Sequence, residues 1–157
     1  MANILTAYYS RTGNTEAMAA IIAETLTGEN NQTDLRKIEN VHYESLLEYD
    51  GIILGTPVYY GTMASSVKKL LDDSVKIHGK LSGKAGGTFS SSANIGGGNE
   101  TALTGILHAL LIHGMIIQGD PQGDHYGPVA INHPDSRAED NCRRFAKRFS
   151  ALTNRLI

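Results

Sequence analysis

Cysteine, tryptophan and long hydrophobic runs are scarce or missing in this chain. Its one cysteine, Cys142, has no partner for an internal disulfide or a Cys-x-x-Cys pair, so redox chemistry requires a bound cofactor. No apolar run approaches the roughly 20 residues that a membrane span needs, and the amino terminus enters a strand without a leader-like segment. We therefore expect a cytoplasmic protein that makes no membrane contact, with Cys142 as a packing residue.

An excess of charge of either sign is also lacking. The 14 lysines and arginines nearly balance the 16 aspartates and glutamates, and the formal net charge is -2. This balance argues against a nucleic-acid partner, because nucleic acids favour strongly basic chains. A length of 157 residues with 41% hydrophobic residues predicts one domain over residues 1–157.

Apolar runs alternate with helical patterns along the chain. This alternation is typical of an α/β fold, in which helices cover both faces of a parallel sheet. Five strands are expected, at Asn3 to Tyr9, Thr33 to Ile38, Gly51 to Gly55, Ala85 to Ser90 and Met115 to Gln118. Helices are expected at Asn14 to Leu26, Met63 to Ile77, Glu100 to His113 and Asp135 to Leu156, with a short helical piece at Tyr43 to Glu48.

The loop from Ser10 to Thr15 joins the first strand to the first helix and is suited to a phosphate. It combines three hydroxyls with a glycine and an asparagine at a helix amino terminus, where free N–H groups and the helix dipole favour an anion. Asn14 stands where a triphosphate loop would carry lysine, and the loop offers no cysteine or aspartate nucleophile. A phosphate monoester that is held and not transferred fits best. In the alternative interpretation, Thr12 or Asn14 only caps the helix.

Two further loops also follow strands, and in a parallel sheet ligands bind beyond the carboxyl ends of the strands. Residues 56–62 contain Tyr59 and Tyr60 between a proline and a glycine, an arrangement suited to covering a flat ring. Residues 90–98 offer small side chains and bare backbone, against which a planar ring could lie. The loops together predict a ligand with a phosphate at one end and a polar aromatic ring at the other, although the tyrosines could instead be surface or dimer contacts.

The loop Ser10-Arg11-Thr12-Gly13-Asn14-Thr15 resembles the phosphate loop of flavodoxins. Five other segments, in the same order, are similar to the tryptophan-repressor-binding-protein family of flavin-dependent NAD(P)H:quinone oxidoreductases. They are Gly55 to Ala64, Lys69 to Asp72, Gly83-Lys84 with Phe89 to Ser91, Gly96 to Thr101, and His113 to Ile117. The chain departs from this family in having no tryptophan and only a short segment, Val75 to Lys84, before the fourth strand.

This resemblance implies a flavodoxin-like three-layer αβα sandwich, with a five-stranded parallel sheet in the order 2-1-3-4-5, that binds flavin mononucleotide (FMN). The first loop would hold the phosphate, Val58, Tyr59 and Tyr60 would line the isoalloxazine ring, residues 91–98 would contact its pyrimidine edge, and His113 would lie near the flavin. The implied cofactor-binding residues are Ser10, Arg11, Thr12, Gly13, Asn14, Thr15, Pro57, Val58, Tyr59, Tyr60, Gly61, Ser91, Ser92, Ala93, Asn94, Ile95, Gly96, Gly97, Gly98 and His113. No catalytic residue is expected beyond the flavin, and no metal ligands.

Other polar residues are expected to have structural roles. His108 is assigned to the helix surface or to packing, and His113 could alternatively cap its helix. Residues 124–126, Asp-His-Tyr, are expected in a solvated loop that passes near the mouth of the flavin site. The last helix is basic and is expected to present a solvated face, with Arg137, Arg143, Arg144, Lys147, Arg148 and Arg155.

The leading hypothesis is an FMN-containing reductase that takes electrons from NAD(P)H and passes them to quinones or similar small acceptors. A flavodoxin-type carrier of single electrons between protein partners is the main alternative. The near-neutral charge weakens that alternative, since such carriers are typically acidic around the flavin. A regulatory domain that has lost the flavin is a third hypothesis, and a homodimer or higher homo-oligomer is left open.

Overall fold

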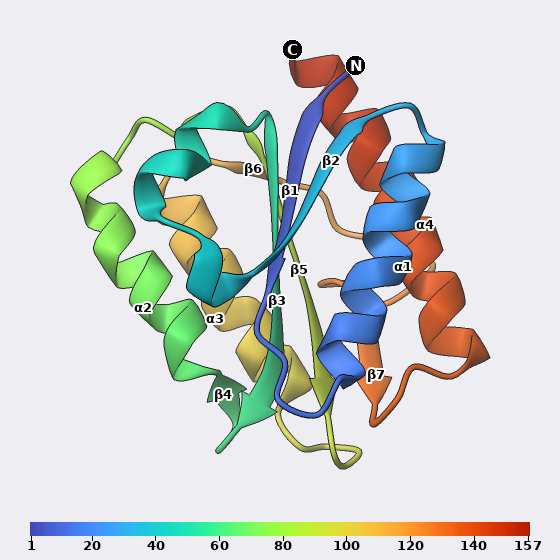
Figure 1. Ribbon diagram of the computed structural model, residues 1–157. Helices are drawn as coiled ribbons and strands as arrows, with labels where there is room; N and C mark the ends of the chain where they lie inside the picture. Colours follow the sequence, from blue (N-terminus) through green and yellow to red (C-terminus); the bar gives the residue numbers. More distant parts are fainter.

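A parallel sheet lies at the centre of the computed structural model, which describes all residues 1–157 (Figure 1). Its strands run in the order β2 (Gln32–Lys37), β1 (Asn3–Tyr8), β3 (Gly51–Tyr59), β5 (Ala85–Ser92) and β6 (Ile116–Ile117). Their pairings are all parallel. The flavodoxin-like α/β fold and the strand order expected from the sequence are therefore confirmed.

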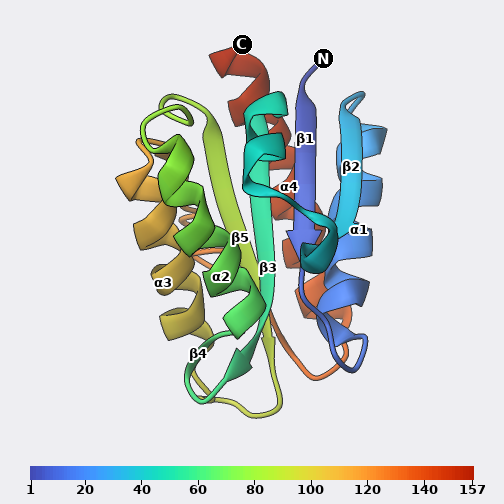
Figure 2. The ribbon, with the colours of Figure 1, turned by 60° about the vertical axis from the view of Figure 1, so that its left-hand side comes forward.

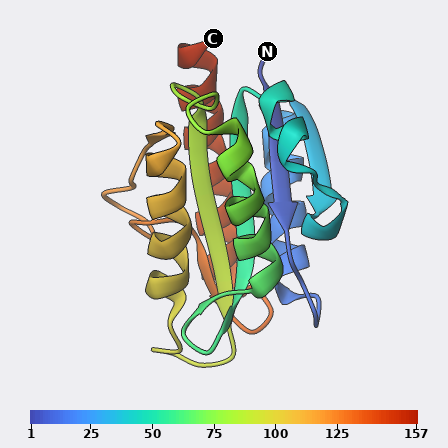
Figure 3. The ribbon, with the colours of Figure 1, turned by 90° about the vertical axis from the view of Figure 1, so that its left-hand side faces the viewer.

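Four helices complete the sandwich. Figure 1 shows α1 (Asn14–Gly28) and α4 (Ser136–Leu156) on one face of the sheet, and α2 (Ser65–Asp73) and α3 (Asn99–Ile112) on the other. Figure 3 shows the second of these faces, with α2 and α3 lying side by side along β5. Three short 3-10 helices, Ile38–Asn40, Tyr43–Glu48 and Ser74–Ile77, join these elements. No helix combines the length and the apolar character that a membrane crossing requires.

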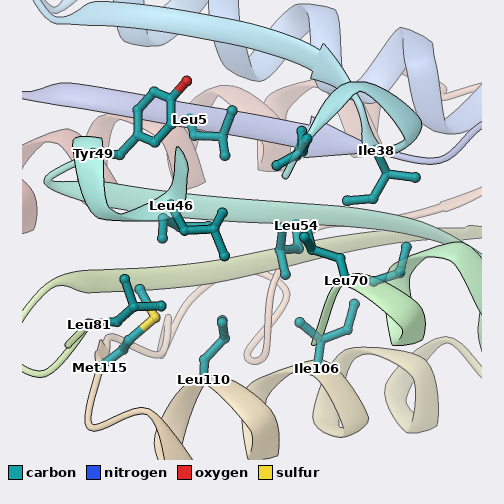
Figure 4. Close-up of a cluster of buried hydrophobic side chains, with 14 of the residues drawn as sticks. Leu5, Ile38, Leu46, Tyr49, Leu54, Leu70, Leu81, Ile106, Leu110 and Met115 are labelled. Atoms are coloured by element: carbon teal, nitrogen blue, oxygen red, sulfur yellow. The ribbon is translucent and has the colours of Figure 1, made fainter. Parts of the chain in front are cut away.

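The central strands β1 and β3 are buried on both faces because each contributes to two hydrophobic clusters. Ile4 and Ile53 point toward α1 and α4, whereas Leu5 and Leu54 point toward α2 and α3. Figure 4 shows the second cluster, in which Leu5 and Leu54 of the sheet lie with side chains from the covering helices and connections. This burial on both faces explains why the strands read as continuous apolar runs. The edge strands β2 and β6 lack a buried side chain.

Two short strands were not predicted. β4 (Thr62–Met63) pairs antiparallel with the end of β3, so the predicted loop 56–62 is a β-hairpin and α2 starts at Ser65. β7 (Val129–Ile131) pairs with the far end of β5, beyond β6. The expected fifth strand, Met115 to Gln118, corresponds to β6, whereas β7 lies in a segment expected to be a loop, and the sheet has seven strands.

The loops that carry the predicted site gather at one end of the molecule. Figure 2 shows the loop after β1, the β3–β4 hairpin and the loop after β5 together at the bottom, opposite both chain termini. This is the edge formed by the carboxyl ends of the parallel strands, where ligands of such sheets bind.

Candidate functional site

The loop after β1 presents donor groups that have no partner within the chain. Gly13 adopts a left-handed conformation with φ 96°, and its N–H donates to Ser10 Oγ at 3.1 Å, which folds the loop back on itself. No side chain caps α1, so the alternative role of Thr12 or Asn14 as a helix cap is not what the structure shows. The backbone N–H groups of Thr12, Asn14 and Thr15 make no hydrogen bond inside the chain. The loop is therefore arranged to bind an anion.

The β3–β4 hairpin forms a second wall. Tyr60 and Gly61 have φ values of 47° and 79°, and this pair of positive values is typical of the tight two-residue hairpin turn. Tyr60 is fully exposed, and a tyrosine in this backbone region is strained. The buried hydroxyl of Thr56 accepts a hydrogen bond from Ala64 N–H at 2.9 Å and fixes the base of the hairpin.

Tyr59 leans from this hairpin toward the first loop. Its ring meets that of Tyr9 edge to face, with ring centroids 6.0 Å apart. Burial raises the pKa of Tyr59 above its usual value, the Tyr9 hydroxyl adds to this rise, and the Arg11 guanidinium opposes it. Tyr59 is therefore neutral at physiological pH and stands close to the cation of Arg11.

The loop after β5 is held by a chain of side-chain hydrogen bonds. Asn99 Nδ2 donates to Ser92 Oγ at 2.9 Å, and this hydroxyl donates to Asn94 O at 2.9 Å. The backbone N–H groups of Asn94, Ile95 and Gly96 remain without partners inside the chain. Beyond them, the loop touches the hairpin, since a Cβ on Gly98 would lie 2.8 Å from Gly61 Cα.

A cleft of about 470 Å³ lies between the three loops. Its lining residues are Ser10, Arg11, Thr12, Asn14, Thr15, Pro57, Val58, Tyr59, Ser91, Ser92, Ala93 and Asn132. At its floor, the hydroxyls of Thr15 and Ser91 are hydrogen-bonded to each other at 2.8 Å. The structure thus brings together the predicted phosphate loop and the bases of the other two loops. Gly13, Tyr60, Gly61 and residues 94–98 belong to the same three loops but are not among the lining residues.

Asn132 is a cleft residue that sequence reasoning missed. It follows β7 with φ 58°, and its N–H donates to Ser92 O at 2.7 Å. The apolar triplet Val129 to Ile131 before it was the available signal, but it lies in a segment rich in glycine and proline that was assigned to a loop.

His113, which the resemblance implies to be near the flavin, does not line the cleft. It follows α3, at the edge of the sheet opposite the three loops, and is buried. The hydroxyl of Ser74 donates to Leu71 O, so it must accept from His113 Nε2–H at 2.7 Å. Nδ1 is buried without a partner. Burial, and to a lesser degree His78, lowers the pKa of His113, so within this chain it is a neutral packing residue.

We expect His113→Gln to reduce the pH dependence of stability. Because the pKa of His113 is lower in the folded chain, its contribution is fully present above about pH 6.5 and is lost as the pH falls. Urea unfolding at pH 7 and pH 5 should therefore show a smaller difference in the variant than in the wild type. The exposed His108→Gln serves as the control, and an unchanged difference in His113→Gln would contradict this assignment.

Residues 118–128 form a loop between β6 and β7 that is bound to α4. Asp120 makes a two-point contact with Arg144, at 2.5 and 2.8 Å, and lies 3.7 Å from Arg148. Asp124 pairs with Arg137 at 2.8 Å. His125 and Tyr126 are exposed, as expected for a solvated loop, but residues 124–126 do not line the cleft. Part of the basic face of α4 forms ion pairs with the carboxylates of this loop, so this face is not only exposed to solvent.

Asp120→Asn should destabilise the chain by about 2 kcal/mol, because it weakens hydrogen bonds to a charged partner. The hydrogen bond from Arg144 holds the pKa of Asp120 well below its usual range, so its stabilisation is present above about pH 4 and is lost in acid. Urea denaturation at pH 7 measures this loss. Asp140→Asn is the control, since Asp140 is exposed and lies 3.8 Å from Arg143. Equal stability of the two variants would contradict the stabilising role of the contact between Asp120 and Arg144.

The chain matches known proteins in sequence. The family model described as flavodoxin domain matches residues 5–96. A flavodoxin from Clostridium saccharobutylicum is 35% identical over 91% of this chain and 92% of its own length. An NAD(P)H dehydrogenase (quinone) from Chromohalobacter salexigens is 37% identical over 77% of this chain and 72% of its own length.

Solved structures agree on the fold. A flavodoxin, WrbA-like protein from Agrobacterium tumefaciens superimposes with a TM-score of 0.84 at 24% identity, over 100% of both chains. Flavodoxin 2 from Bacillus cereus gives a TM-score of 0.79 at 28% identity, over 95% of this chain and 98% of its own. With its matched family model, its strand order and its cleft at the sheet edge, the chain belongs to the flavodoxin family of FMN-binding proteins.

Proposed function

We propose that residues 1–157 act as one FMN-binding unit that takes electrons from NAD(P)H and reduces quinones or similar small acceptors. The observation that carries this proposal is the absence of carboxylates around the cleft. Neither the lining residues nor residues 56–64 and 90–99 include an aspartate or glutamate. A carrier that docks on basic partner proteins gains from an acidic rim, whereas a rim without carboxylates suits a small neutral acceptor.

The residues present fit FMN. The cleft volume lies in the usual range for small-molecule sites, about 300–1,000 Å³. The unpaired N–H groups and free side chains of Thr12 and Asn14 suit the phosphate, while Tyr59 and the exposed Tyr60 suit the ring. We propose as the cofactor-binding set the cleft-lining residues together with Gly13, Tyr60, Gly61 and residues 94–98 of the same loops.

When bound, FMN supplies the redox chemistry, because its ring system can take up a hydride and return electrons. The chain binds and orients the cofactor through the first loop and limits water access with Tyr59. The free N–H groups of Asn94, Ile95 and Gly96 are available to favour negative charge on the bound ring. No side chain of the cleft is needed as an acid or base, which agrees with the lack of histidine, aspartate and glutamate there.

Anaerobic mixing of the FMN-loaded protein with NADPH or NADH tests this proposal. We expect the flavin absorbance to bleach with at least one nucleotide, and added benzoquinone to restore it. If neither nucleotide reduces the protein, and chemical reduction instead yields a long-lived one-electron-reduced species, the reductase proposal fails.

A flavodoxin-type electron carrier is the second candidate. The observation in its favour is length, since the Clostridium flavodoxin aligns over nearly its whole chain, whereas the quinone dehydrogenase extends beyond the aligned region. The anaerobic experiment separates the two functions.

A further inference from the structure

The ring of His113 has a nitrogen lone pair that no group of this chain uses. Nε2–H donates to Ser74 Oγ at 2.7 Å, and this hydroxyl donates to Leu71 O at 2.7 Å. These two hydrogen bonds fix the tautomer, so Nδ1 carries no proton and is a buried acceptor without a partner. Burial and, to a lesser degree, His78 lower the pKa of His113, which keeps the ring neutral at pH 7. A buried acceptor that is left unpaired is costly, so a group that binds Nδ1 would remove this cost.

A second imidazole lies close to the first. His78 directly follows the 3-10 helix Ser74–Ile77, and its ring centroid is 6.1 Å from that of His113. Both rings line a groove of about 540 Å³ between α2 and α3, which lie side by side in Figure 3. His78 is exposed, so its ring can turn toward a ligand in this groove.

The spacing of the two rings fits a metal ion held between them. A zinc ion binds imidazole nitrogen at about 2.0–2.1 Å, so the centroids of two ligating rings lie about 5.2 Å apart at a tetrahedral angle and about 6.4 Å apart when the rings are opposed. The observed 6.1 Å falls within this range. Histidines that bind metals usually donate their other ring N–H to a fixed oxygen, and His113 Nε2–H already does so with Ser74.

We propose that His113 Nδ1 and a ring nitrogen of His78 bind a divalent transition-metal ion, of the zinc, nickel or copper type, in the groove between α2 and α3. Imidazole suits these ions, whereas magnesium and calcium prefer oxygen ligands. No group of three histidine, cysteine or carboxylate side chains is placed to hold one ion, so water completes the coordination and the ion is exchangeable. Neither histidine lines the FMN cleft, so this site is independent of the proposed function.

Titration of the wild-type protein with ZnCl₂, followed by calorimetry and by NMR amide shifts, tests the site. We expect one Zn²⁺ to bind per chain with shifts centred on His78 and His113, and MgCl₂ to cause no such shifts. His78→Gln and His113→Gln should each weaken Zn²⁺ binding at least about tenfold, and Ser74→Ala about tenfold because the tautomer is no longer fixed. His78 is exposed, so His78→Gln remains informative even if His113→Gln does not fold.

His108→Gln is the matched control, because His108 is an exposed histidine that lines the same groove but has no ring contact with His113. Its Zn²⁺ affinity should stay within about twofold of the wild type, since it removes no proposed ligand. The inference is overturned if the wild type does not bind Zn²⁺, if His78→Gln retains wild-type affinity, or if His108→Gln loses as much affinity as His78→Gln.

Discussion

The double variant Thr12→Ala/Asn14→Ala should bind FMN at least about 100-fold more weakly than the wild type and bind riboflavin with nearly unchanged affinity. Both side chains line the cleft and neither caps α1, so their removal subtracts phosphate ligands without removing a helix cap. Two hydrogen bonds to a charged group, each contributing about 1.5–3 kcal/mol, account for this magnitude. Quenching of FMN fluorescence measures the affinity.

The matched control is Asn40→Ala/Thr101→Ala, which removes the same two residue types at exposed positions outside the cleft. It should bind both flavins as the wild type does. If the Thr12→Ala/Asn14→Ala protein retains FMN affinity within threefold, the first loop is not part of the FMN site.

Gly55→Ala should lower the free energy of unfolding by about 3 kcal/mol or more. Gly55 of β3 pairs with Phe89 of β5, and the Phe89 ring lies over the space that a Cβ on Gly55 would occupy. Phe89 is fully buried and cannot move aside without disturbing the core, so the extra methyl group overpacks it. Because Thr56 follows directly, the change should also distort the hairpin wall of the cleft. Urea denaturation with a two-state fit measures the loss.

Gly28→Ala is the control for this variant. Gly28 ends α1, and a Cβ there would meet no atom within 4 Å. Alanine is the better helix former, so stability should stay equal or rise by up to about 1 kcal/mol. If the free energy of unfolding of Gly55→Ala is as high as that of Gly28→Ala, the Phe89 ring does not pack against Gly55 of β3.

The positions of the main strands and the first loop could be predicted because their causes are local, whereas the order of the strands came from the resemblance. Buried strands read as apolar runs, and the donors of residues 10–15 come from one turn at one helix end. The glycine-rich loop after β5 was recognisable for the same reason, since small residues leave the backbone open. Each of these features depends on neighbours in the sequence.

The features that were missed depend on contacts between distant residues. β7 is a strand only because β5 extends far enough to pair with it, which brings Asn132 to the cleft. Asp120 and Arg144 are 24 residues apart, and nothing in either segment alone identifies its partner. His113 was placed near the flavin by resemblance, but its position at the end of α3 puts it at the opposite edge of the sheet and against Ser74.

Mapping backbone amide shifts by NMR as FMN is added tests most directly whether the three loops form the cofactor site. We predict saturable shifts at one FMN per chain, concentrated in residues 10–15, 57–61 and 91–98 and at Asn132, with His113 unaffected. Shifts centred on His113 and its neighbours, or no saturable shift at all, would contradict the account.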